Sequence, residues 1–436
     1  MTYPDAIQFL YSLQLFGAQL GLENTLKLAA LAGNPHTKLR FIHLAGTNGK
    51  GSTSAMLEGV YRASGLRVGL FTSPHLVNFA ERIQVNRQMI SEAEVVRLVS
   101  ELQPWLKQFP ADVHPTFFEV VTVMALRYFA EQKCDLVIWE TGLGGRLDAT
   151  NIVTPLASVI TNIQFDHERW LGSTLDKIAA EKAGIIKPGV PVITGATEPE
   201  ALAVIQKVAQ RQQSPITVVT PEQTDLAPLN EIELPLLGWH QRFNAAVALA
   251  TVKTLRATLP VSDKAISDGL SHVQWPGRMQ LVRVSGGRKF LLDGAHNPGG
   301  VATLRDALAE YFPGEQPALI IGMLEDKNWH LMCEILVPLA RRTLCVPVSS
   351  SRTMTGETLA ESCRRTSPAT DVTACSSLAE ALRAVASEPF VVIAGSLYLI
   401  GEAMEQLHLA VTPDSDEKGL NEWGGGKRGR GSKMED

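Results

Sequence analysis

Short apolar runs alternate along the chain with segments in which apolar residues return at the spacing of a helix. The runs are nearly continuous and rich in β-branched residues, which is typical of strands in a parallel sheet covered on both faces. We predict strands over residues 41–45, 68–71, 136–139, 157–161, 192–194, 290–292, 318–321, 343–346 and 390–394. The helical period predicts helices over residues 119–132, 243–255, 301–311 and 378–386, among others. Strands that alternate with helices in this way predict an α/β fold.

Two series of strands follow one another, so the chain is expected to form two α/β domains. Its 436 residues agree with this expectation, because a domain typically holds roughly 150 residues. Proline and glycine interrupt the pattern at residues 275–278, just before the second series. We therefore predict a first domain over residues 1–276 and a smaller, Rossmann-like domain over residues 277–410. Residues 411–436 are rich in glycine and charge and poor in apolar side chains, which predicts a disordered tail.

Composition excludes several classes of protein. Hydrophobic residues make up 45% and charged residues 19%, which is ordinary for a globular chain, and the net charge of −5 gives no reason to expect nucleic acid. No apolar run reaches the ~18 residues that a membrane-spanning helix requires, so we expect no membrane partner. The N-terminus has no basic residue before Lys27, unlike a signal peptide. The five cysteines form no CxxC pair, which favours reduced thiols in a cytoplasm over disulfides or a zinc site.

A glycine-rich turn lies between the first predicted strand and a helical segment. Glycines let backbone N–H groups surround phosphate oxygens, and the following helix N-terminus adds its dipole. Lys50 would neutralise the terminal phosphates, and a hydroxyl after it would bind Mg²⁺. The turn departs from GxxxxGK[ST], because Gly51 separates Lys50 from Ser52. We predict a phosphate loop whose nucleotide contacts are Thr47, Asn48, Gly49, Lys50, Gly51, Ser52 and Thr53.

Eight further motifs follow this loop in order. They are FTSPHL (71–76), TFFE (116–119), ETGLGGRLDATN (140–151), DH (166–167), EKAG (181–184), WPGR (275–278), DGAHNP (293–298) and GSL (395–397). Together with the loop, they resemble the ATP-dependent ligases of the Mur superfamily, and within it the folylpolyglutamate synthase and dihydrofolate synthase family. The resemblance implies a first domain of the P-loop ATPase type with a mostly parallel sheet.

The resemblance also implies the reaction. A ligase of this family uses ATP to convert the carboxylate of dihydropteroate or a reduced folate into an acyl phosphate, which the amine of L-glutamate then attacks. Mg²⁺ is the implied cofactor, and a monovalent cation such as K⁺ is a further candidate. The expected partners are therefore small molecules, and we expect a monomer.

The implied metal site contains Glu140, His167, Ser52 and Ser73. Glu140 ends a predicted strand, at the edge where ligands bind in open parallel sheets, and its carboxylate is a hard ligand of the kind that Mg²⁺ prefers. A salt-bridged or helix-capping Glu140 is the alternative. His167 follows another strand by a short loop, and it joins the metal site, like both serines, only through the resemblance.

Lys182 is the least usual candidate. In the family that the motifs resemble, the matching lysine is carbamylated, which turns a cation that would repel Mg²⁺ into a carboxylate that organises the site. An unmodified lysine on a solvated helix face is the alternative. We expect Lys182 and Lys50 to act in catalysis, together with Asp293 and His296 from the second domain.

Residues near and beyond the domain boundary complete the expected ATP and glutamate sites. The Asn244 amide suits an adenine edge, and Arg278 would clamp phosphates or form an interdomain salt bridge. Asp293 would contact ATP across the cleft. By the resemblance, His296 and Ser396 would hold the incoming glutamate.

The pterin acid would bind to a further group of residues, again by the resemblance. They are Gln19, Thr116, Phe117, Phe118, Glu119, Leu147, Asp148 and Ala149. Phe117 or Phe118 offers a stacking surface for a flat pterin, although core packing would explain both side chains equally well.

Two other functions remain open at this point. A peptidoglycan-type Mur ligase shares the ATPase and C-terminal domains, but it carries a UDP-sugar-binding domain before the phosphate loop, which here begins at residue 46. A nucleotide switch that hydrolyses ATP without ligation would not need a second domain with its own polar strand ends. The ligase hypothesis requires that Lys50, Glu140 and His167 lie in one cleft and that His296 faces them.

Overall fold

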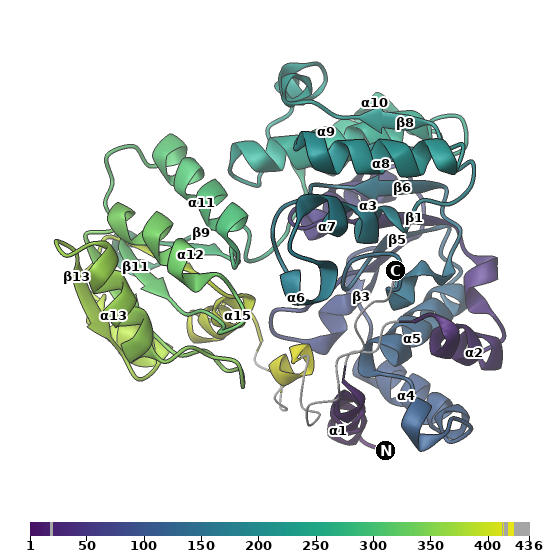
Figure 1. The fold of residues 1–436 in the computed structure, drawn as a ribbon, viewed down its shortest axis with the longest axis horizontal. Coiled ribbons are helices and arrows are strands. Elements are labelled where there is room, and N and C mark those ends of the chain that lie inside the picture. The colour runs from purple at the N-terminus through teal and green to yellow at the C-terminus, as the bar shows by residue number, and fades with distance from the viewer. Residues whose placement is uncertain (18–20, 412, 414–416, 423–436) are drawn as a thin grey trace.

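Two β-sheets, each covered by helices, form two lobes that lie side by side (Figure 1). The computed structural model describes residues 1–17, 21–411, 413 and 417–422. We call the eight-stranded sheet with helices α1–α10 the N-terminal lobe, and the six-stranded sheet with helices α11–α15 the C-terminal lobe. Both sheets are mostly parallel, which confirms the predicted α/β fold.

The N-terminal sheet has a parallel centre, with one antiparallel hairpin at its edge. Its strands are, in spatial order, β4 (Gln88–Met89), β3 (Ile83–Val85), β2 (Val68–Phe71), β5 (Leu136–Glu140), β1 (Phe41–Ala45), β6 (Ala157–Ile160), β7 (Val192–Thr194) and β8 (Ile216–Val218). Alternate residues of β5 enter two different cores, Val137 and Trp139 on one face and Leu136 and Ile138 on the other. Continuous apolar runs such as this one therefore mark the centre of the sheet.

The C-terminal sheet is parallel except for its last strand. Its strands are, in spatial order, β13 (Asp371–Ala374), β12 (Arg342–Cys345), β11 (Ala318–Ile321), β14 (Phe390–Ala394), β10 (Lys289–Asp293) and β9 (Gln280–Arg283). Only β9 runs antiparallel, and it follows directly on the Trp275–Arg278 connection between the lobes. Here too, helices cover both faces.

Fifteen α-helices surround the sheets in the described part of the chain. Those of the N-terminal lobe are α1 (Tyr3–Ser12), α2 (Glu23–Leu31), α3 (Lys50–Ala63), α4 (Glu92–Leu106), α5 (Phe117–Glu131), α6 (Glu168–Leu171), α7 (Leu175–Ala183), α8 (Pro199–Arg211), α9 (Trp239–Thr254) and α10 (Asp263–Ser271). Those of the C-terminal lobe are α11 (Pro298–Tyr311), α12 (Trp329–Leu336), α13 (Gly356–Thr366), α14 (Leu378–Ala384) and α15 (Leu397–Gln406). Helices α3, α9 and α10 pack together on one face of the larger sheet, whereas α1, α2, α4 and α5 pack on the other.

All nine predicted strands exist, within one residue at each end. The strands that sequence missed are β3, β4, β8, β9 and β13, which include both edges of each sheet. Edge strands are only partly covered, so they need no continuous apolar run; the side chains of β4, for example, are exposed.

The C-terminal segment corrects one prediction. Residues 411–436 were expected to be a disordered tail, yet residues 418–421 form a short 3₁₀ helix, η10 (Lys418–Asn421), and Leu420 is only 1% exposed. The tail prediction is therefore wrong for residues 417–422, whose single leucine enters the core of the N-terminal lobe. Residues 412, 414–416 and 423–436 lie outside the described residues.

Two further findings concern the chain as a whole. Within the described ranges, no helix combines the length and the apolar character needed to cross a membrane. All five cysteines are free thiols and buried.

Candidate active site

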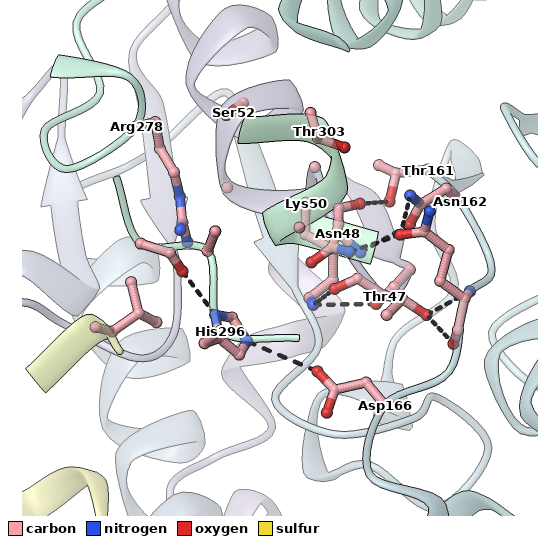
Figure 2. A pocket seen from close by; sticks show the side chains of 18 of the residues that line it. Thr47, Asn48, Lys50, Ser52, Thr161, Asn162, Asp166, Arg278, His296 and Thr303 are labelled. Atoms are coloured by element: carbon pink, nitrogen blue, oxygen red, sulfur yellow. Dashed lines mark hydrogen bonds and ion pairs between the residues drawn. The ribbon is translucent and has the colours of Figure 1, made fainter. Parts of the chain in front are cut away.

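One large cavity, of about 600 Å³, lies where the two lobes meet. Both lobes contribute to its lining, which Figure 2 shows from close by. Most predicted site residues line it: Thr47, Asn48, Gly49, Lys50, Gly51, Ser52, Ser73, Glu140, His167, Lys182, Asn244, Arg278, Asp293, His296 and Ser396. The structure therefore brings together in one place the residues that the ligase hypothesis requires.

The phosphate loop depends on glycine at its tightest points. Strand β1 ends at Ala45, and helix α3 begins at Lys50, with Gly49 in the left-handed region at φ 85°. A Cβ atom on Gly46 would lie 1.9 Å from the Thr161 hydroxyl, so a side chain does not fit there. Thr53 is fully buried and does not line the cavity, which departs from its predicted role as a nucleotide contact.

Lys50 and Glu140 lie opposite one another at the loop. The Lys50 ammonium donates to the Gly46 carbonyl at 3.0 Å and lies 4.0 Å from the Glu140 carboxylate. Burial raises the pKa of Glu140 to about 7, although Lys50 and the backbone N–H of Ser73 act in the opposite direction. The cavity thus contains a desolvated carboxylate that a nearby divalent cation would stabilise in its charged form.

The donor set around Glu140 fits Mg²⁺. Ser52 and Ser73 line the same cavity and add hydroxyl oxygens, which are hard ligands. No group of three or more His, Cys, Asp or Glu side chains in the described ranges is arranged to hold a metal by itself. A Mg²⁺ ion would therefore also need oxygens from the nucleotide, as is usual for this ion.

The ion-pair partner of His167 is Asp166, not Glu140. Its Nε2 lies 3.9 Å from the Asp166 carboxylate, and its backbone adopts the left-handed conformation at φ 52°. Burial and the charge of Lys327 lower the pKa of His167 to about 3, so its imidazole is neutral.

Lys182 is buried, which rules out the alternative of a solvated helix face. Its side chain reaches into the site from α7 and donates to the Gly46 carbonyl at 2.9 Å. Burial, together with the charge of Lys50, lowers the pKa of Lys182 to about 7. A substantial fraction of this amine is therefore unprotonated, and hence nucleophilic, at neutral pH.

Asp166 joins the two lobes. It accepts hydrogen bonds from Lys327 at 2.6 Å and from Asn297 at 3.0 Å, and it lies 3.6 Å from Nε2 of His296 (Figure 2). Burial acts to raise the pKa of Asp166, but Lys327 and the adjacent histidines outweigh it and hold the pKa below its usual range. Asn297 also bonds Asn48 of the phosphate loop at 3.1 Å, so the second lobe contacts the loop directly.

Lys327 was missed from sequence, although its position carried a signal. It follows the buried strand β11, at the same edge of the sheet as the predicted loop at residues 293–298. Trp239, which is 47% exposed and stacks on Phe243, was missed as well and lines the cavity.

Three predicted ATP contacts have protein partners of their own. Asp293 accepts from the backbone N–H groups of Met279 and Ala295, at 2.8 and 2.9 Å, so it ties the connection between the lobes to its own loop. Asn244 packs against Gly49, and Arg278 packs against Gly294. All three side chains remain part of the cavity lining.

A second pocket, of about 130 Å³, adjoins the first. Its lining includes seven predicted acid-binding residues, namely Thr116, Phe117, Phe118, Glu119, Leu147, Asp148 and Ala149. Gln19 lies outside the described residues. Ser73, Pro74, Gly142 and Leu143 line both pockets, so the two share a wall.

Several of these residues also stabilise local structure. Thr116 and Glu119 form the capping box of α5, and Asp148 caps the short turn at residues 149–152 while accepting from Leu143. Phe117 is buried beneath Arg82, whereas Phe118 is only partly buried and packs on Gly142. Phe118 is therefore the better of the two predicted stacking surfaces.

Comparison with known proteins agrees with this geometry. The family model described as the Mur ligase middle domain matches residues 44–252, and the one described as the Mur ligase, glutamate ligase domain, matches residues 277–397. Dihydrofolate synthase/folylpolyglutamate synthase of Bacillus subtilis is 39% identical over 78% of this chain and 84% of its own length. Folylpolyglutamate synthase of Lacticaseibacillus casei is 34% identical over 93% of this chain and 99% of its own.

Solved structures give the same result. Folylpolyglutamate synthase of Thermotoga maritima has a TM-score of 0.80 at 34% identity, over 95% of this chain and 99% of that one. The structure of E. coli FolC in complex with DHPP and ADP has a TM-score of 0.82 at 32% identity, over 94% and 98%. The chain therefore belongs to the folylpolyglutamate synthase/dihydrofolate synthase family of Mur ligases, and it is an ATP-dependent ligase.

Proposed function

We propose that this ligase adds L-glutamate both to dihydropteroate and to reduced folates. The observation that carries the proposal is the pair of pockets that share a wall: a large cavity that contains the phosphate loop, and a smaller pocket with an aromatic surface. An acid whose ring system stacks on Phe118 would present its carboxylate at the shared wall, next to the phosphate loop. Relatives that carry both activities in their names support the bifunctional assignment.

In the first step, a carboxylate oxygen of the acid attacks the γ-phosphorus of ATP, and the bond to ADP breaks. Lys50 and Arg278 would neutralise the phosphoryl oxygens during this transfer. Ser52, Ser73 and Glu140 would hold Mg²⁺, which supplies positive charge at the phosphates when it is bound. His167 would belong to the same metal site. A monovalent cation such as K⁺ is a further proposed cofactor.

In the second step, the amine of glutamate attacks the acyl carbon, phosphate leaves and the amine loses its protons. His296 and Ser396 would receive the glutamate from the C-terminal lobe. The Nδ1–H of His296 donates to the Gly294 carbonyl at 2.7 Å, and burial lowers the pKa of His296 to about 4. Its Nε2 therefore carries a lone pair beside the Asp166 carboxylate, at 3.6 Å, and a proton accepted there would form an ion pair with Asp166.

Lys182 would carry a carbamate in the working enzyme. Its unprotonated amine can attack CO₂ to form N-carboxylysine with release of a proton, and the product would be an anion beside the phosphate loop. We further propose functional domains over residues 1–276 and 277–410, a monomer, and a cytoplasmic location in which the five free thiols stay reduced.

Phosphate release from ATP tests the function. Purified protein should release phosphate only when glutamate and an acid are both present, with dihydropteroate and tetrahydrofolate assayed side by side. Mass spectrometry should show an acid that has gained one glutamate. Turnover of a UDP-muramoyl substrate would favour the peptidoglycan-type alternative, and phosphate release without a ligated product would favour a nucleotide switch.

A further inference from the structure

Residues Glu417–Glu422, here called the C-terminal strap, lie between the two lobes (Figure 1, yellow). The sequence gives no strong reason for this placement, since most neighbouring residues of the tail are small or charged. Yet Glu417 is 1% and Asn421 7% exposed, so the strap is built into the fold. Polar groups buried to this degree normally have specific partners.

On one side, the strap is bonded to the N-terminal lobe. The Glu417 carboxylate accepts from the backbone N–H of Phe79 at 2.5 Å, and its carbonyl accepts from Nε2 of His75 at 2.8 Å. Gln14 donates to the Gly419 carbonyl at 2.8 Å, and Leu420 packs into the core. These bonds join the last described residues to the beginning of the chain and to the loop after β2.

On the other side, the strap is bonded to the C-terminal lobe. Lys418 forms an ion pair with Glu405 of α15. The Glu422 carboxylate accepts from the Ser351 hydroxyl at 2.9 Å and lies 3.4 Å from Nε of Arg352. The strap is therefore a link between the lobes that is separate from the Trp275–Arg278 connection.

Three strap residues, Leu420, Asn421 and Glu422, line the smaller pocket, and Asn421 lines the larger one too. The Asn421 side chain accepts from Nη2 of Arg82 at 2.6 Å and donates to the His75 carbonyl at 3.0 Å. Nε of Arg82 donates to Nδ1 of His75 at 2.8 Å, and the guanidinium lies over the Phe117 ring at 5.4 Å. Asn421 thus fixes a buried cation in the wall of the pocket.

We propose that the C-terminal strap is a wall of the acid-binding pocket, and that Asn421 is a positioning residue that determines affinity for the acid through Arg82. The inference rests on the proposed function of this pocket and adds to it. Among the described contacts, the strap has no hydrogen bond to the phosphate loop or to His296 and Ser396, the residues proposed to bind glutamate. Loss of Asn421 should therefore weaken binding of the acid and leave binding of ATP and glutamate unchanged. Substitution of a residue that only stabilised the fold would weaken binding of the acid, ATP and glutamate to a similar extent.

Asn421→Ala tests the inference, and Lys418→Ala is the matched control, because Lys418 belongs to the strap but does not line either pocket. Binding of dihydropteroate and tetrahydrofolate is measured by titration, without turnover, and the KM values for ATP and glutamate are measured kinetically. Asn421→Ala should weaken acid binding about tenfold, since it removes a hydrogen bond to a charged group, and should leave both KM values within about twofold. Lys418→Ala should leave acid binding within about twofold.

Each outcome bears on the inference. Unchanged acid binding in Asn421→Ala would overturn the inference. So would an equal rise of the Kd for the acid and of the KM values for ATP and glutamate, or acid binding that Lys418→Ala weakens as much as Asn421→Ala does. A thermal unfolding curve for each variant shows whether the protein remains folded. If the wild-type protein bound neither acid, the proposed function itself would be wrong, and the inference about the strap would fail with it.

Discussion

At the residue scale, the site contains two lysines and a carboxylate that lie close together. The ammonium groups of Lys50 and Lys182 donate to the same oxygen, the carbonyl of Gly46, and the Glu140 carboxylate faces Lys50. Two like charges at one acceptor are costly unless one of them is lost, and Lys182 has the lowered pKa that this arrangement requires. The roles of these residues can be separated by substitution.

Replacement of Lys50 by alanine should abolish formation of the acyl phosphate. The change removes a cation of the phosphate loop that would neutralise the transferred phosphoryl group, and such contacts are worth a hundredfold or more, roughly 3 kcal/mol in the transition state. ADP release with saturating substrates measures the effect. Lys207→Ala, on the exposed face of α8, is the control and should retain wild-type activity.

If Lys182 is carbamylated, as we propose, activity should depend on CO₂. Since the pKa of Lys182 is lowered to about 7, the reactive amine predominates above pH 7 and declines below it. Enzyme stripped of CO₂ should lose activity and, at equal concentrations of dissolved CO₂, regain it faster at pH 8 than at pH 6. Lys182→Arg should be inactive under both conditions, and a native mass without an added carboxyl group would exclude the modification.

We expect His296 to act in the glutamate half of the reaction. His296→Ala should mainly raise the KM for glutamate, because the residue faces the cavity from the C-terminal lobe, while the KM for ATP changes little. Steady-state kinetics with each substrate varied in turn would show this. A variant with wild-type glutamate kinetics would remove His296 from the glutamate site.

At the scale of elements, the strand that ends in a polar loop is the unit from which the site is built. Glu140 ends β5, the phosphate loop follows β1, and the loop at residues 293–298 follows β10. Sequence predicted these strands because a buried central strand must be apolar on both faces. It missed edge strands such as β4 and β9, and it missed Lys327, because partner strands and side-chain contacts far apart in the chain leave no local pattern.

The turn from β1 into α3 depends on the absence of a side chain at Gly49. Gly49 and Gly65 have nearly the same φ, 85° and 91°, but only at Gly49 would a Cβ atom meet another residue, at 2.4 Å from the Asn244 side chain. Gly65→Ala should lower the free energy of unfolding by about 1 kcal/mol through backbone strain alone.

Gly49→Ala should lower the free energy of unfolding by about 1 kcal/mol more, since Asn244 must also leave its bond to Gln241. Chemical denaturation of the two variants measures the difference. Equal losses would mean that Asn244 moves aside freely and does not hold the loop.

At the scale of the whole molecule, the lobes are joined at several places, including the Trp275–Arg278 connection, the contacts of Asp166 and the C-terminal strap. The first could be predicted from proline and glycine in the sequence. The other two could not, because they depend on residues separated by 161 and 338 positions that only the folded chain brings together.

The stabilisation that the Asp166 contacts give to the interface between the lobes depends on pH. Because the folded-state pKa of Asp166 lies below its unfolded value of about 3.9, its contribution to stability is present above about pH 4 and is lost as the pH falls through the folded-state pKa. Asp166→Asn should lower the free energy of unfolding by about 3 kcal/mol at pH 7, because it leaves the Lys327 side chain, which is 8% exposed, without its counter-charge.

Thermal unfolding of wild type and Asp166→Asn between pH 3 and pH 7 checks this effect. The two curves should approach each other as the pH falls. Asp268→Asn, which removes a surface ion pair with Lys264, should follow the wild type throughout. A constant gap between wild type and Asp166→Asn would show that the Asp166 charge is not what joins the lobes.

The wall shared by the two pockets has a consequence for product length. If the ring system of the acid is anchored beside Phe118, as we propose, an acid that already carries several glutamates must bend for its terminal carboxylate to reach the shared wall. Each added unit would then occupy the interlobe cavity, where we also place the nucleotide. The longest chain that the enzyme makes would accordingly be limited by crowding in that space and not by recognition of the pterin.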